Sequence, residues 1–253
     1  MKTVFITGAA NGIGLATARK FAANGWFVGL FDIDNESISK LLETTEFAQA
    51  CGCYCDVSDR NSISDAIDYF CSRSGGKMDA LINNAGVLSG GEFEKMEQHN
   101  VHAMIDINIK GMTDVAHLAF PVLKSTGNST LVNICSASSI YGFPLLAVYS
   151  ATKFYVRGLT EALNLEWKKS GVHVSCVKPP YVKTAMFDAI PERATEKVSA
   201  EFTPQQVANV VYQAATGNRV AYIIGKKIKL WDQLVRLFPN SIGKYITRYL
   251  ANP

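Results

Sequence analysis

The sequence contains no run of about 18 consecutive apolar residues, the length that a membrane-spanning helix needs. The first segment, MKTVFITGAANGIG, has one lysine and a short apolar stretch, and it enters glycine-rich sequence without a small-residue cleavage site. We therefore expect a cytoplasmic protein with no signal peptide. A strong charge excess is also absent, because the formal net charge is +3, and this argues against nucleic acid as the main partner.

Six cysteines in 253 residues are too few for a disulfide framework. Cys51, Cys53 and Cys55 alternate in CGCYCD, so on a strand they would point to one face. A zinc site there would need a fourth ligand, and no histidine lies near in sequence. We interpret the stretch as a buried strand and predict no metal. The G-x-S-x-G elbow of serine hydrolases is absent as well.

The sequence does contain apolar, β-branched stretches that alternate with helix-like segments. Hydrophobic residues make up 48% of the chain and charged residues 19%, which is typical of a globular protein with a sizeable core. The pattern predicts an α/β protein with a doubly wound parallel seven-stranded sheet, a three-layer Rossmann fold. We expect one domain over residues 1–225, with 226–253 as a helical extension of it. The expected strands are 3–7, 26–32, 50–56, 79–86, 130–136, 173–179 and 220–225.

A glycine-rich turn follows the first expected strand. TGAANGIG places Gly8, Gly12 and Gly14 where a turn would open a helix, although the spacing differs from G-x-G-x-x-G. The second strand ends in LFDID, so that Asp32 could accept hydrogen bonds from an adenosine ribose. Strand, glycine turn, helix, strand and acid in this order predict a nucleotide-binding site.

The stretch YSATK places Tyr149 and Lys153 four positions apart. On a helix they would share one face, and the lysine charge would lower the pKa of the tyrosine and make it a usable acid or base. Taken alone, the pair also fits an ordinary helix with a half-buried tyrosine and a solvated lysine.

Together these segments resemble the short-chain dehydrogenase/reductase family, from about residue 2 to 225. TGAANGIG at 7–14 matches the family's cofactor loop, NNAG at 83–86 matches the segment after its fourth strand, and DV at 56–57 matches its adenine-side pair. The family's asparagine corresponds to Asn108 in DINIKG. Its serine corresponds to Ser136 in NICSASSIYGFP, which we choose over Ser138 and Ser139 because it stands at the end of the expected fifth strand, thirteen residues before Tyr149.

The resemblance implies hydride transfer between a nicotinamide and a secondary alcohol or ketone. The implied catalytic residues are Asn108, Ser136, Tyr149 and Lys153; Ser136 and Tyr149 contact the substrate, and Asn108 holds a water that links Lys153 to solvent. The implied cofactor-binding residues are Gly8, Asn11, Gly12, Ile13, Gly14, Asp32, Ile33, Asp56, Val57, Asn84, Ala85, Gly86, Tyr149, Lys153, Pro179, Val182 and Thr184.

The expected cofactor is NAD rather than NADP. Asp32 would accept from a ribose 2′-OH and repel a 2′-phosphate, and Asn11 stands where NADP-preferring relatives often have a basic residue. One departure from the family is Pro180, which follows Pro179 where a glycine is usual and predicts a stiffer turn at the pocket mouth.

Two other functions fit part of the pattern. The first is a catalytically inactive nucleotide-binding protein that senses redox state or acts as a scaffold; it is disfavoured because all four catalytic positions are filled. The second is an epimerase or dehydratase of a related fold, which would need a longer substrate domain than 253 residues allow.

Residues 226–253 hold six basic residues and one acid. Apolar residues at helical spacing predict one helix that ends before Pro239 and a second helix after it. Either the helices pack on their own domain or a partner subunit, or they form an interfacial membrane anchor. In both cases we expect a homodimer rather than a tetramer, and a tail that closes over 184–202 to line a pocket for a bulky apolar substrate. The apolar residues are Ile228, Trp231, Leu234, Val235 and Phe238, then Ile242, Tyr245, Ile246, Tyr249 and Leu250.

Overall fold

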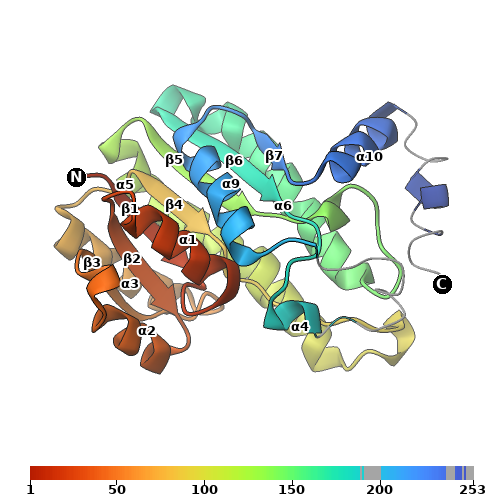
Figure 1. Cartoon of the computed structure of the whole chain (residues 1–253), viewed down its shortest axis with the longest axis horizontal. Coiled ribbons are helices and arrows are strands. Elements are labelled where there is room, and N and C mark those ends of the chain that lie inside the picture. Colours follow the sequence, from red (N-terminus) through yellow and green to blue (C-terminus); the bar gives the residue numbers. More distant parts are fainter. Residues whose placement is uncertain (189, 191–200, 238–242, 247, 249–253) are drawn as a thin grey trace.

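The computed structural model describes residues 1–188, 190, 201–237, 243–246 and 248. Within them, seven strands form one parallel sheet in the order β3-β2-β1-β4-β5-β6-β7 (Figure 1). This confirms the predicted fold class. The strands are β1 (Thr3–Thr7), β2 (Phe27–Asp32), β3 (Ala50–Tyr54), β4 (Ala80–Asn83), β5 (Ser129–Ile134), β6 (Val172–Lys178) and β7 (Ala221–Ile223).

Helices cover both faces of the sheet and make the three layers. One face carries α1 (Gly12–Ala22), α2 (Asn35–Leu42) and α9 (Pro204–Thr216), and the other carries α3 (Arg60–Ser74), α5 (Met112–Thr126) and α6 (Ala147–Glu166) (Figure 1). The chain enters α5 through α4 (Gln98–Ile105) and a π-helical segment (Asp106–Gly111), α7 (Ala185–Asp188) follows β6, and α10 (Lys226–Leu237) follows β7.

The first strand shows why its sequence is apolar without alternation. Val4 and Ile6 belong to the core on the α1 and α9 face. Phe5 belongs to the core on the opposite face, where its ring meets that of Phe70 edge-on at 5.4 Å between centroids. A strand that is buried on both faces has no solvent side on which to place polar residues.

Strand order reverses between β1 and β4, because β2 and β3 lie on one side of β1 and the later strands on the other. In doubly wound sheets, ligands bind in the crevice beyond the carboxyl ends of the strands at this switch point. The segments that follow β1, β2, β4 and β5 therefore meet at one edge of the sheet.

Five strands end one to three residues earlier than predicted, and the ends of β4 and β5 bear directly on that edge. β4 ends at Asn83 instead of residue 86, and β5 ends at Ile134 instead of residue 136. After β4 the amides of Asn84 and Ala85 both donate to the Thr7 hydroxyl, at 3.0 Å each, instead of pairing with a strand. The NNAG segment thus leaves the sheet and becomes part of the crevice wall.

The cysteine prediction is confirmed for the strand. Cys51 and Cys55 are buried in one core and Cys53 packs against it, so all three share a face. All six cysteines of the chain are free thiols.

The first helix of the tail is present as α10 (Figure 1). Trp231 and Val235 are buried with Ile140, and Ile228 and Ile246 pack against them. The apolar face of α10 therefore lies on its own domain, which favours the packed arrangement over the membrane anchor. Residues 243–246 are helical as predicted for the second helix. The predictions for Phe238, Pro239, Ile242, Tyr249 and Leu250 lie outside the described residues.

Candidate active site

A cavity of about 490 Å³ opens at the carboxyl ends of the strands. Its lining extends along the chain from Gly8 to Trp231. Every residue predicted to bind the cofactor or the substrate lines this cavity, and Asn108 is the predicted site residue that lies behind its wall. The structure thus brings together residues that are separated by up to 176 positions in sequence, from Gly8 to Thr184.

The glycine turn between β1 and α1 is built for close backbone approach. A Cβ added to Gly14 would lie 1.8 Å from the Gly8 carbonyl oxygen, and Gly8 itself has a φ of 65°. Asn11 stands at the N-cap of α1, but its side chain makes no capping hydrogen bond. The N–H groups of the first turn are therefore available to an anion, and the helix dipole favours negative charge there.

Asn84 ties the end of β4 to this turn. Its Nδ2 donates to the carbonyls of Thr7 at 2.9 Å and Gly8 at 3.0 Å. The Thr7 hydroxyl accepts from the amides of Asn84 and Ala85. These bonds hold the two loops together at the floor of the crevice.

Asp32, at the end of β2, is held with both carboxylate oxygens engaged. Oδ2 accepts from the Ala10 amide at 2.9 Å, and Oδ1 accepts from the Asp34 amide at 3.1 Å. A carboxylate oxygen has two lone-pair directions, so each can accept one further hydrogen bond. Asp32 therefore lines the cavity as a fixed negative group that suits a ribose diol.

Asp56 and Val57 follow β3 on the same side of the cavity. The Asp56 carboxylate accepts from the Ser58 amide at 2.8 Å and from the Ser58 hydroxyl at 2.7 Å. Val57 is buried in the core under α3 and α5. The two residues form a fixed corner of the cavity wall beyond β3.

Ser136 lies two residues beyond β5, where it caps the short 3₁₀ helix Ala137–Ser139. Its Oγ accepts from the Ser138 amide at 3.1 Å and lies 3.2 Å from the Ser138 hydroxyl. Ser139 is fully buried and donates to the Ser136 carbonyl at 2.7 Å. Of the three serines, Ser136 and Ser138 line the cavity, and Ser139 supports the turn from behind.

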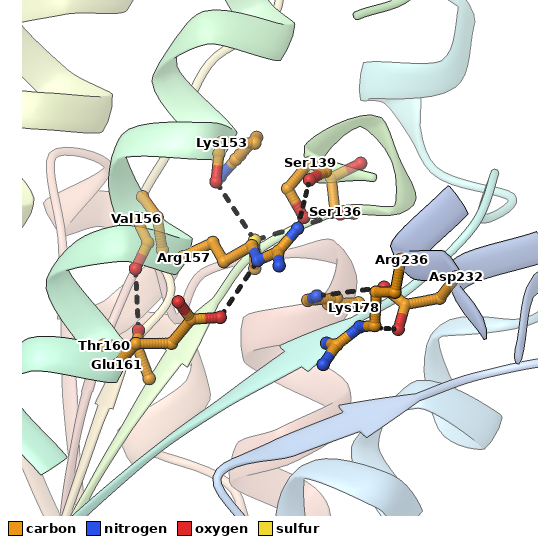
Figure 2. Close-up of polar contacts among 11 residues, drawn as sticks. Ser136, Ser139, Lys153, Val156, Arg157, Thr160, Glu161, Lys178, Asp232 and Arg236 are labelled. Carbon is orange, nitrogen blue, oxygen red and sulfur yellow. Dashed lines mark hydrogen bonds and ion pairs between the residues drawn. The ribbon is translucent and has the colours of Figure 1, made fainter. Parts of the chain in front are cut away.

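Tyr149 and Lys153 lie on α6, as the four-residue spacing predicted, and both are buried. The Lys153 ammonium donates to the Ile134 carbonyl at 3.0 Å and lies 5.5 Å from the centroid of the Tyr149 ring. The Lys153 carbonyl accepts from the Cys135 thiol at 3.3 Å. Figure 2 shows Lys153 on this helix. The ammonium is thus tied to β5 and faces the ring.

The electrostatics of the pair differ from the prediction. Burial raises the pKa of Tyr149 to about 12, the Ser136 hydroxyl lowers it in part, and the Cys135 thiol adds to the increase. Burial also lowers the pKa of Lys153. The predicted lowering of the tyrosine pKa is wrong for the protein's own groups, because the cost of removing the phenolate from water raises that pKa overall.

Asn108 is fully buried in the π-helical segment before α5. Its Oδ1 accepts from the Val87 amide at 2.9 Å, and its Nδ2 donates to the Val87 carbonyl at 2.8 Å and to Thr152 Oγ1 at 3.3 Å. Both amide hydrogens are thus used to clamp the segment after NNAG onto α6. A water held by Asn108 would therefore bind to an oxygen, not to the amide nitrogen.

The segment after β6 closes the cavity opposite the glycine turn. The Pro179 carbonyl accepts from the Ala137 amide at 2.9 Å, which joins this segment to the Ser136 loop. A Cβ on Gly12 would lie 3.6 Å from the Thr184 methyl group, so the two loops face each other closely. Pro179 and Pro180 have no N–H, and the first backbone donors after β6 are those of Tyr181 and Val182.

The other half of the cavity is apolar, and the sequence motifs missed most of it. Tyr181 meets Phe143 at 6.4 Å and Phe187 at 5.6 Å, both edge-on. Ile228 and Trp231 of α10 complete this wall. The sequence signals for this apolar wall were the helical spacing in the tail, the expected closure over 184–202 and Pro180 at the pocket mouth.

In the described part of the chain, no helix is long and apolar enough to cross a bilayer. The same residues hold no group of three or more histidine, cysteine or acidic side chains placed to bind a metal ion.

Comparison with known proteins agrees with this architecture. The chain is 30% identical to the 3-oxoacyl-[acyl-carrier-protein] reductase FabG of Thermotoga maritima, over 92% of this chain and 98% of that protein. It is 28% identical to a 3alpha-hydroxysteroid dehydrogenase of Mediterraneibacter gnavus, over 89% and 93%. A short chain dehydrogenase/reductase from Burkholderia phymatum, solved in complex with NAD, superposes with a TM-score of 0.85 and 25% identity over 93% of each chain. Residues 2–195 match the family model for short chain dehydrogenases, and the chain belongs to this family of oxidoreductases.

Proposed function

We propose that this protein is an NAD(H)-dependent oxidoreductase that interconverts a bulky, apolar secondary alcohol and its ketone. The observation that carries the proposal is the position of Tyr149, Lys153 and Ser136 in one cavity with the glycine turn and Asp32. A nucleotide cradle and a buried proton-transfer group in one cavity suit a nicotinamide enzyme better than a binding protein.

The chain's own residues fit the dinucleotide. The glycine turn and the uncapped start of α1 would hold the pyrophosphate, and Asp32 would hold the adenosine ribose. Bound there, NAD would accept a hydride from the substrate carbon, and NADH would return one. Asp32 supports NAD over NADP because a second negative charge beside it would be repelled.

Tyr149 is the proposed acid and base. Its hydroxyl would take the proton of the alcohol in oxidation and return it in reduction, while Ser136 donates a hydrogen bond to the substrate oxygen. Lys153 lies close enough to favour the phenolate as it forms. The hydrogen bond to the Ile134 carbonyl fixes the ammonium in position. Asn108 joins the Val87 carbonyl to Thr152 on the same helix as Lys153.

The apolar half of the cavity supports the substrate class. Phe143, Tyr181, Phe187 and Trp231 present aromatic surface beyond the catalytic groups, and the Tyr181 hydroxyl has its pKa raised by burial. A steroid is the substrate named for one relative, which is in keeping with a bulky apolar ketone here.

A catalytically inactive protein of the same fold is the alternative, and turnover separates the two. The purified protein would be incubated with NAD and a panel of secondary alcohols of increasing size, and NADH formation followed at 340 nm. We expect turnover that grows with apolar bulk. Tight NADH binding without turnover of any alcohol or ketone would favour the inactive alternative.

A further inference from the structure

The apolar wall of the cavity depends on where α10 lies. Ile228 and Trp231 line the cavity, and the same helix packs on Ile140 and Tyr141, which follow the Ser136 turn. The helical segment after α10 adds to this contact, since a Cβ on Gly243 would lie 2.3 Å from the Tyr141 ring. A shift of α10 would therefore move the substrate wall and release the support of the loop that carries Ser136.

Apolar contacts alone fix such a helix poorly. They have little directional preference, so they favour burial of the apolar face more strongly than one exact position of the helix on it. A buried charge is different, because leaving it without its partner is strongly unfavourable.

A buried ion pair joins α10 to the sheet. Lys178 is the last residue of β6 and is fully buried, and its Nζ lies 3.4 Å from Oδ1 of Asp232 on α10. The Asp232 side chain is itself only 6% exposed. Its other oxygen accepts from Nε of Arg236, one turn further along, at 2.7 Å. Figure 2 shows the three side chains converging where α10 meets β6.

The position of Lys178 makes the pair relevant to the cavity. Lys178 directly precedes Pro179 and Pro180, which line the cavity, and Asp232 directly follows Trp231. Each partner is thus adjacent in sequence to a wall residue. Among the described side chains, Asp232 is the acidic group in ion-pair contact with Lys178.

We propose that the Lys178–Asp232 ion pair is a positioning device that fixes α10 against the sheet, so that Trp231 and Ile228 determine which substrates the cavity accepts. The specificity part rests on the proposed function. The positioning part rests only on the buried pair and the packing of α10.

The test uses the full chain with Asp232→Asn, which keeps the shape of the side chain and leaves Lys178 without its counter-charge. Lys178→Met/Asp232→Leu replaces both partners by apolar groups and removes the unpaired charge. Arg236→Gln is the matched control, because it removes only the outer partner, which is 51% exposed. Hydrogen–deuterium exchange of peptides covering 226–237 and 137–143 reports the positioning without any substrate.

In Asp232→Asn we expect amide exchange in both peptides to accelerate by about tenfold or more, while the control stays within about twofold. The double variant, which has no unpaired charge, should still exchange faster than wild type in both peptides and should have a lower ratio of kcat/KM for long over short alcohols, since it lacks the directional ion pair. NADH affinity should change less than about twofold in all three, because the nucleotide cradle lies elsewhere. Trp231→Ala, with the pair intact, should lower the same long-over-short ratio.

Unchanged exchange in Asp232→Asn would overturn the positioning role. Wild-type exchange of both peptides in the double variant would also overturn it, and this holds even if Asp232→Asn does not fold. Equal losses of kcat/KM on long and short alcohols in Trp231→Ala would overturn the specificity role. A wild-type protein that oxidises no alcohol would refute the proposed function separately, and the exchange data would still decide whether the pair holds α10.

Discussion

The Lys153 ammonium lies 5.5 Å from the centre of the Tyr149 ring, while its hydrogen bond goes to the Ile134 carbonyl on β5. The lysine is therefore fixed by the sheet and acts on the tyrosine through space. In the proposed reaction, a charge held in this way would stabilise the phenolate without needing to move.

Tyr149→Phe should lower kcat by about 10²–10⁴-fold, the range that proton transfer by a positioned side chain contributes. The ring is retained, so packing and NADH affinity should stay near wild type. Steady-state rates and NADH fluorescence titration measure the two effects. Near-normal turnover in this variant would remove Tyr149 from the catalytic assignment.

The raised pKa of Tyr149 predicts different pH profiles for alcohol oxidation and ketone reduction. Below a pKa of about 12, the phenolate fraction grows about tenfold per pH unit, so alcohol oxidation should rise with pH through the neutral range. Ketone reduction needs the protonated phenol, which stays dominant, and this rate should be flat until the pKa of the ternary complex is approached. A positive nicotinamide ring would lower that pKa and shorten the rise. A flat oxidation profile from pH 6 to about 9 would contradict a high tyrosine pKa.

Asp32→Ala should reduce the preference for NAD over NADP by about 10- to 100-fold in kcat/KM, the equivalent of one hydrogen bond to a charged group. Because Asp32 also accepts from Ala10, the alanine variant could loosen the glycine turn. Asp32→Asn is the control: it keeps an acceptor for Ala10 but removes the charge, and it should admit NADP better than wild type. A wild-type enzyme that prefers NADP would show that the charge does not govern the choice.

Gly14→Ala should abolish NADH binding and destabilise the fold by about 1–3 kcal/mol, the usual cost of overpacking. The added methyl would collide with the Gly8 carbonyl, which has no room to retreat. Gly158→Ala on α6 is the matched control, because no atom lies within 4 Å of its added Cβ. That control should be neutral or slightly stabilising in thermal unfolding, and equal effects of the two changes would refute the steric account.

The full chain should be a homodimer by light scattering. α10 extends the molecule beyond β7, at the edge of the sheet (Figure 1), where it would stand in the way of a further subunit. Removing residues 227–253 should then permit higher oligomers, or leave an unstable protein because Trp231 would no longer cover Ile140. A tetramer of the full chain would contradict this expectation.

The sequence predicted the nucleotide half of the cavity well, because it depends on local rules. A turn such as Gly8 to Gly14 needs glycine for reasons that its own backbone sets, and Asp32 is placed by the end of its strand. In the same way, the i, i+4 spacing of Tyr149 and Lys153 predicted that their side chains share one face of a helix.

The remainder depends on contacts that no local pattern encodes. A lower tyrosine pKa was expected from the neighbouring lysine alone, whereas burial by the whole fold raises that pKa. The contacts of the Asn108 side chain with Val87 and Thr152 arise from the π-helical segment, which no sequence pattern announced. The partner of Lys178 lies 54 positions away on another element, so the strand sequence HVSCVKP gives no sign of it.

The place of α10 in the chain has a consequence for folding during synthesis. All seven strands precede it, and chains fold from the N-terminal end as they are made. The nucleotide crevice can therefore assemble on a nascent chain before the substrate wall exists. Such an intermediate would lack Ile228 and Trp231, so the apolar side of the cavity would be open to water until α10 packs against Ile140.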